Sequence, residues 1–207
     1  MACLVMTLLI NKRKRRRHLF DGSNHSHMPI SRLIFFPKNT QLLVDDELIL
    51  KTISRIDFIN KVPYEKNHYL PGEHFLSLLT FLGCSPNINL QPTPDEHHCF
   101  ISILQASNKP KHLGHTSTCH PKCPNCTKRI ANWKTDDWQK EGVLCTCDKC
   151  GTQTPYAQLN WKQECGFGCC GFEITHIYPH EAVPTDQLLE ALEEKTRAEW
   201  LYCYTNN

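Results

Sequence analysis

Long apolar runs are absent from this sequence. No stretch approaches the roughly 20 apolar residues that a bilayer-spanning helix needs. The first ten residues, MACLVMTLLI, precede a basic run, whereas a secretory signal places its charge first. We therefore expect no membrane partner and a cytoplasmic location, where thiols stay reduced and available to metals.

Familiar enzyme motifs are also absent. The sequence has no glycine-rich phosphate loop, no G-x-S-x-G turn and no convincing nucleophile with a base. Its 207 residues are enough to bury an ordinary hydrophobic core, so disulfides are not needed to stabilise a very small fold. Nothing in the sequence identifies a small-molecule substrate, and an enzyme is the least favoured class.

A large excess of charge is missing too, since the net charge is +2. The charge is unevenly placed: Lys12 to Arg17 are all basic, and Asp21 is the one acidic residue before Met28. The remainder carries 17 basic and 20 acidic residues, a net charge of −3. A basic run of this kind can contact nucleic acid or anionic lipid. We interpret residues 1–27 as a disordered basic tail, or as a non-native extension whose true start is Met28.

The segment 28–118 is predicted to form an α+β half. Arg32–Pro37 is short, apolar and closed by proline, which favours a buried strand. Asp45 or Asp46 is placed to cap a helix that runs to about Arg55. The apolar and β-branched run Cys99–Leu104 predicts a second strand.

Two further expectations concern the same half. The clearest helix signal covers Glu73 to Leu82, with Pro71 in the first turn and Gly83 as the stop. Its apolar residues recur at helical spacing and are expected in the core. The polar stretch Gln105–Thr118 is predicted to be a linker.

The segment 152–207 is predicted to form the second α+β half. Phe172–Tyr178 alternates in the manner of a strand, and a helix begins at Thr185 and buries Leu188, Leu189 and Leu192. Trp200–Tyr204 predicts the final strand. The fold class is thus α+β, with two βαβ-like halves in the element order of a ferredoxin-like sandwich and a zinc ribbon, residues 119–151, inserted between them.

The ribbon is predicted from the cysteines. Nine of the 13 cysteines lie between Cys119 and Cys170, and clustering at short spacing is typical of metal binding. Two C-x2-C pairs, separated by 20 residues, supply the four thiolates that Zn²⁺ prefers. We predict that the zinc ligands are Cys123, Cys126, Cys147 and Cys150. Four sulfur ligands leave no position for water, so the zinc is expected to be structural and not catalytic.

Other metal-binding residue types lie outside these pairs. Five remaining cysteines, with His112, His115 and His120 nearby, could form a second metal site or an iron–sulfur centre, although buried free thiols explain the cysteines more simply: Cys119, Cys145, Cys165, Cys169 and Cys170. His176 and His180 suggest a metal-dependent hydrolase, but Pro179 breaks the helix that such a site needs, and no third ligand is evident. Trp133 and Trp138 can pack inside the ribbon or stack on a base, and packing is favoured.

A family resemblance is carried by five segments of this sequence: LLTFLGCSP (78–86), CPNC (123–126), CDKCG (147–151), QECGFG (163–168) and IYPHEAVPTDQLLEAL (177–192). With these segments the chain resembles uncharacterised gammaproteobacterial proteins that carry an internal zinc ribbon. The resemblance runs from Met28 to the C-terminus. It implies zinc binding and no particular activity.

Two function classes follow. The first is a non-enzymatic interaction or adapter protein whose zinc ribbon stiffens a surface that binds another protein. The second is a regulatory protein that binds nucleic acid through phosphate contacts and stacking. The net charge of −3 outside the basic tail favours the first.

Overall fold

The computed structural model describes residues 30–83, 88–92 and 97–206. The predicted basic tail, residues 1–27, lies outside these ranges. Within them, no helix is long and apolar enough to cross a membrane. The fold is mixed α+β, with mostly antiparallel sheets and two α-helices.

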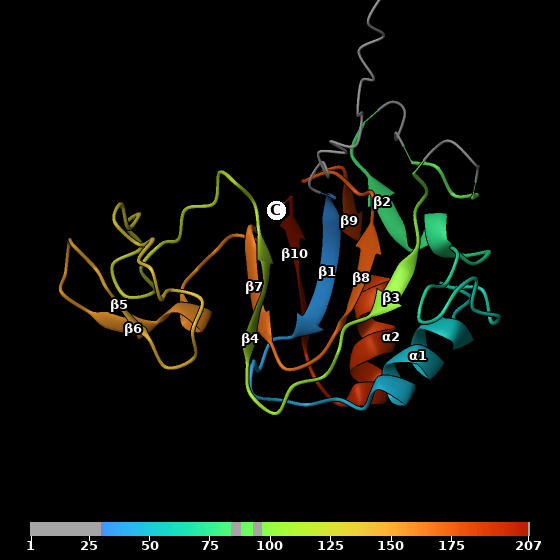
Figure 1. Cartoon of the computed structure of the whole chain (residues 1–207), viewed down its shortest axis with the longest axis horizontal. Helices are drawn as coiled ribbons and strands as arrows, with labels where there is room; N and C mark the ends of the chain where they lie inside the picture. The colour runs from blue at the N-terminus through green and yellow to red at the C-terminus, as the bar shows by residue number, and fades with distance from the viewer. Residues whose placement is uncertain (1–29, 84–87, 93–96, 207) are drawn as a thin grey trace, which may run out of the picture.

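The body of the protein is organised around a four-stranded sheet (Figure 1). Its order is β10 (Trp200–Thr205), β1 (Arg32–Pro37), β8 (Phe172–Thr175) and β3 (Ile101–Ile103), and every neighbouring pair is antiparallel. The two strands predicted within 28–118 and the two predicted within 152–207 therefore form one sheet. β1 is apolar on both sides because both faces of this sheet are covered.

Both helices predicted from caps are present. Helix α1 (Asp46–Arg55) begins after Asp45, whose side chain accepts hydrogen bonds from the N–H groups of Glu47 and Leu48. Helix α2 (Asp186–Thr196) begins after Thr185 in the same way. In chain order α1 lies between β1 and β3, and α2 lies between β8 and β10. The caps satisfy N–H groups that have no partner within the helix.

The main core lies between the helices and one face of the sheet. Phe35 in β1 stacks on Phe172 in β8, with ring centroids 4.6 Å apart, and both side chains are fully buried. The helices contribute four fully buried side chains: Ile49, Ile53, Leu188 and Leu192. Burial of aromatic and branched side chains on this scale is the main source of stability for the body.

The prediction of a helix over Glu73–Leu82 is wrong. The segment forms a short 3₁₀ turn, η1 (Phe75–Ser77), and then strand β2 (Leu79–Phe81), which pairs with β9 (Ala182–Pro184). Leu82, expected in the core, is 58% exposed. A helix of ten residues is marginal by itself, and pairing with β9 offers the same backbone an equivalent set of hydrogen bonds.

The prediction of a linker over Gln105–Thr118 is also wrong in part. Residues Lys111–His115 form strand β4, which pairs with β7 (Cys165–Gly168). This pair covers the sheet face opposite the helices. It approaches closely because Gly166 has no side chain: a Cβ there would lie 2.6 Å from Sγ of Cys203. Polar residues do not signal such a strand.

The cysteine-rich segment forms a separate lobe beside the body (Figure 1). Its regular structure is β5 (Leu144–Thr146) paired with β6 (Gln153–Pro155), followed by the 3₁₀ turn η2 (Tyr156–Gln158). The lobe has its own hydrophobic cluster, distinct from the main core. We call this lobe, from Cys119 to Trp161, the ribbon lobe.

Candidate metal centre

The four predicted ligands meet within the ribbon lobe. The sulfur atoms of Cys123, Cys126, Cys147 and Cys150 all lie within 4.8 Å of one another. Sγ of Cys123 is 3.7 Å from Sγ of Cys150, and Sγ of Cys126 is 3.7 Å from Sγ of Cys147. These two contacts join one C-x2-C pair to the other. Among the described residues this is the one group of three or more ligating side chains that could hold a metal ion.

The spacing of the sulfur atoms fits a tetrahedral ion. A zinc–sulfur bond of about 2.3 Å places the corners of an S4 tetrahedron about 3.8 Å apart. The two contacts of 3.7 Å match this edge. A disulfide, with sulfur atoms about 2.05 Å apart, does not fit them, and every described cysteine is a free thiol.

The two C-x2-C turns share one backbone shape. In the first, the N–H of Thr127 donates to the carbonyl of Cys123 at 2.9 Å; in the second, the N–H of Gly151 donates to the carbonyl of Cys147, also at 2.9 Å. Both donors have left-handed backbone angles, with φ of 62° at Thr127 and 72° at Gly151. This shape turns two sulfur atoms toward the same point.

The left-handed backbone at Thr127 and Gly151 allows the turn geometry to be tested by substitution. A β-branched residue at φ near +60° costs roughly 1–2 kcal/mol relative to glycine. Gly151→Val should therefore lower the free energy of unfolding of the zinc-loaded lobe by about that amount, whereas Thr127→Gly should raise it slightly. Chemical denaturation followed by Trp fluorescence measures both variants. Equal effects of the same sign at the two positions would contradict the shared turn geometry.

Two polar side chains next to the sulfur atoms were not predicted. Asn125 lies between the cysteines of the first pair and donates through Nδ2 to Oγ1 of Thr152, at 3.1 Å. Oγ1 of Thr152 is 3.3 Å from Sγ of Cys150, and hydrogen bonding by Thr152 lowers the pKa of Cys150 to about 6. A lowered pKa favours the thiolate, the form in which cysteine binds a metal. Asn125 and Thr152 could have been found from the sequence by their positions, since Asn125 lies inside one C-x2-C motif and Thr152 lies just after the other.

A cluster of aromatic rings supports the site from inside the lobe. Trp133 is perpendicular to both Trp138 and Trp161, at centroid distances of 4.9 and 5.1 Å. The hydroxyl of Tyr156 donates to the carbonyl of Trp133, and Nε1 of Trp161 donates to the carbonyl of Tyr156. All four side chains are buried. The packing role expected for Trp133 and Trp138 is thus the observed one, and neither ring is free to stack on a base.

The five remaining cysteines of this region do not form a second metal group among the described residues. All five are buried. Cys170 is held by the main chain, since its Sγ accepts from the N–H of Val44 and donates to the carbonyl of Leu42. Burial raises the pKa of Cys119 to about 11 and that of Cys165 well above its usual value. They are neutral thiols that fill space.

The alternative site at His176 and His180 is not supported. The ring of His176 stacks on His97 with centroids 5.2 Å apart, whereas the ring of His180 packs on Tyr204. Neither histidine belongs to a group of three ligating side chains in the described ranges. Burial and the neighbouring histidines lower the pKa of His176. Both residues have left-handed backbones, with φ of 58° and 64°, which is typical of turns.

His112, one of the histidines considered for a second metal site, lies in β4 against the ribbon lobe. The ring of His112 packs against His115, Trp138 and Phe167, and its Nε2 is buried without a hydrogen-bond partner. Burial, followed by repulsion from His115, lowers the pKa of His112 to about 4. The ring is therefore neutral at neutral pH.

This burial predicts a loss of stability in mild acid. Between pH 6.5 and pH 4 the unfolded chain binds a proton at His112 that the folded chain does not, so stability falls as pH falls. From pH 7 to pH 5 the loss is about 2 kcal/mol. Comparing urea unfolding of the wild type and His112→Phe at both pH values isolates this contribution, because metal loss affects both proteins alike. An unchanged pH dependence in the variant would contradict the assignment.

Comparisons of the chain with protein-family models, with curated proteins and with solved structures give no match. The resemblance to gammaproteobacterial proteins therefore stays a prediction. The four-cysteine group is the feature on which a function can be argued.

Proposed function

We propose that the chain is a zinc-binding, non-enzymatic interaction protein. The supporting observation is the group of four sulfur atoms, with two contacts of 3.7 Å between the C-x2-C pairs. Four thiolates favour zinc over hard cations, which prefer oxygen ligands. They also occupy all four tetrahedral positions, so the bound ion has none left for a substrate.

The role of the ion would be to fold the ribbon lobe. Between Cys119 and Trp161 the regular elements are two three-residue strands and one short turn, which is little structure for a segment of this length. Binding of zinc to such sites contributes on the order of 10 kcal/mol or more to folding. A rigid lobe beside the body then presents a surface for a protein partner, which we take as the first candidate.

Metal analysis tests the zinc assignment. Protein purified without added metal should contain about one zinc per chain, and cobalt exchanged into the site should show the absorption of tetrahedral thiolate coordination. Iron in place of zinc, or metal far below one per chain after refolding with excess zinc, would overturn it.

The proposal extends to the topology of the body. The strand order β10-β1-β8-β3, with α1 between β1 and β3 and α2 between β8 and β10, supports a ferredoxin-like sandwich made of two βαβ halves. The ribbon lobe follows β3 and precedes β8, which supports its insertion between the halves. Residues 28–118, 119–151 and 152–207 would then be the first half, the ribbon and the second half.

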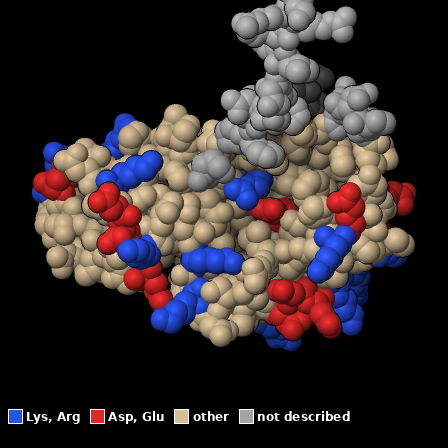
Figure 2. All heavy atoms as spheres, viewed as in Figure 1, with Lys and Arg blue, Asp and Glu red and all other residues tan. Residues whose placement is uncertain are grey.

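Binding to nucleic acid is the second candidate, and one hollow favours it. Lys122, Arg129 and Lys162 line a cavity of about 320 Å³ together with Glu164 and two histidines. None of the three cations forms an ion pair with a carboxylate in the described part of the chain. The distribution of charge differs on the face shown in Figure 2, where acidic and basic side chains are interspersed.

A salt titration separates the two candidates. Phosphate contacts release counterions, so affinity for a mixture of DNA and RNA should fall steeply with salt and fall further in Lys122→Glu. Absence of binding at low salt would remove this candidate and leave the protein partner.

A further inference from the structure

The two edges of the central sheet differ in how far the rest of the chain covers them. At the β3 edge, Ile101 exchanges two main-chain hydrogen bonds with Tyr69, each of 2.8 Å. That edge is therefore partly closed by the chain itself. The β10 edge has no strand beside it in the described ranges. Open edges are templates for another strand, and proteins generally cover or charge them.

The hydrogen bonds around β10 show which groups face outward. The N–H of Lys38 donates to the carbonyl of Glu199 at 2.8 Å and so continues the ladder between β1 and β10. In an antiparallel ladder the bonding direction alternates. The main-chain groups of Trp200 and Tyr202 therefore point away from β1. Tyr204, the next in this series, donates outward to the carbonyl of Gln163.

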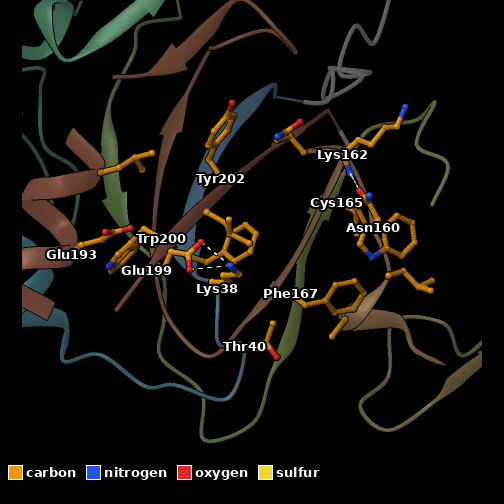
Figure 3. A pocket seen from close by; sticks show the side chains of 17 residues that line it. Lys38, Thr40, Asn160, Lys162, Cys165, Phe167, Glu193, Glu199, Trp200 and Tyr202 are labelled. Atoms are coloured by element: carbon orange, nitrogen blue, oxygen red, sulfur yellow. Dashed lines mark hydrogen bonds and ion pairs between the residues drawn. The ribbon is translucent and has the colours of Figure 1, made fainter. Parts of the chain in front are cut away.

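The outward groups of Trp200 and Tyr202 differ from that of Tyr204 because they have no partner among the described residues. They open into a groove of about 500 Å³, drawn in Figure 3. A groove that exposes alternate N–H and C=O groups of a strand is complementary to one kind of ligand, an extended polypeptide backbone.

The walls of the groove suit side chains of such a peptide. Trp161 of the ribbon lobe and Phe167 of β7 line the groove, together with Leu189 from α2 and Leu201 from β10. Side chains of a strand added to β10 would alternate between the two faces of the sheet. The 40% exposure of Leu201 leaves apolar surface for such a contact.

The charges of the groove are balanced. Nζ of Lys38 is 2.8 Å from a carboxylate oxygen of Glu199, and this ion pair is among the dashed contacts in Figure 3. The other two charged side chains of the lining are Lys162 and Glu193, which come from opposite sides. With two cations and two anions, the lining gives no net attraction to a polyanion, which favours a peptide over a nucleic acid.

We propose that this groove binds an extended segment of a partner protein, which adds to β10 as a further strand. The segment pairs with the main chain of Trp200 and Tyr202 and places apolar side chains, separated by polar ones, against Trp161, Phe167 and Leu201. This inference rests on the proposed function as an interaction protein and specifies the partner chemistry. Because Trp161 belongs to the ribbon lobe, zinc maintains one wall of the groove.

The test uses the full zinc-loaded chain and linear peptides selected from a random displayed library. Selected peptides should bind the wild type and lose about tenfold or more in affinity for Tyr202→Pro, which removes an outward N–H without removing a bond to β1. Methylation of alternate peptide nitrogens should have the same effect, and the amide of Tyr202 should become protected from hydrogen exchange when the peptide binds.

Two further variants guard against a folding artefact. Leu201→Lys keeps every main-chain bond and should also weaken binding, whereas Leu76→Lys changes a side chain that is 48% exposed and does not line the groove. Zinc content and melting temperature of each variant show whether the fold is retained.

The opposing results are distinct. Failure to select any peptide, or equal affinity for wild type and the two edge variants, overturns the groove. A dimer of the free chain that dissociates in Tyr202→Pro assigns the edge to a second copy and also overturns it. Neither result alters the zinc content, so the zinc-binding proposal is judged separately by metal analysis.

Discussion

Cys123→Ser is expected to abolish stoichiometric zinc binding and to unfold the ribbon lobe. Cys123 is nearly fully buried and lies 3.7 Å from Cys150, and no fifth described cysteine belongs to the four-sulfur group. Three thiolates do not close a tetrahedral site, and the loss of metal removes a folding contribution on the order of 10 kcal/mol. Metal analysis measures the first effect, and hydrogen exchange across residues 119–161 measures the second.

The matched control is Cys145→Ser. This cysteine lies in the same lobe and is equally buried, but its sulfur is not part of the four-cysteine group. It should retain about one zinc per chain and lose only the modest stability expected for a buried substitution. Retention of a full complement of zinc by Cys123→Ser would contradict the site.

Phe35→Ala is expected to destabilise the body by about 3–5 kcal/mol. Phe35 is fully buried in the central strand, stacks on Phe172 and also contacts the ring of Tyr202. Its removal leaves a cavity between the sheet and the helices that the packed neighbours cannot fill. Chemical denaturation followed by far-UV circular dichroism gives the change in the free energy of unfolding.

Leu201→Ala is the control in the same sheet. Its side chain is on the opposite face from Phe35 and is 40% exposed, so its loss should cost no more than about 1 kcal/mol. Equal costs for the two variants would show that the helix-covered face is not the main core.

The effects of Cys123→Ser on the ribbon lobe and of Phe35→Ala on the body should be separable. The ribbon lobe and the body have different hydrophobic clusters, and β4 and β7 connect them. We expect Cys123→Ser to leave the amides of α1 and α2 protected, and Phe35→Ala to leave the zinc content unchanged, because units joined by few contacts open independently. Loss of protection in α1 on removal of zinc would show instead that the metal stabilises the whole protein.

The local signals in the sequence were sufficient for several elements. Asp45 and Thr185 offer side-chain oxygens to free N–H groups two or three residues ahead, and both begin the helices predicted for them. The run Arg32–Pro37 is a strand as expected, since it is apolar and short. The C-x2-C spacing predicted two tight local turns, each of which brings two sulfur atoms together, and the fold of the ribbon lobe joins the two pairs.

Segments whose structure depends on a distant partner strand were predicted wrongly or not at all. The apolar spacing of Glu73–Leu82 matches a helix, yet the segment pairs with β9, about 100 residues further along the chain. The polar stretch that contains β4 gave no strand signal, because its partner β7 and the close approach allowed by Gly166 belong to another part of the chain. The lowered pKa of His112 results mainly from burial, which the sequence does not show.

The sequence by itself determined the helix starts, the apolar strands and the two C-x2-C turns, because each depends on residues within a few positions of one another. The paired spacing also identified the four cysteines whose sulfur atoms meet, although the two pairs are 20 residues apart. The tertiary structure decided the strand order, the place of β2 and β4, the burial of His112 and the open edge of β10. Those features depend on contacts between distant segments, whose free energies exceed the small local preferences of a short polar or amphipathic stretch.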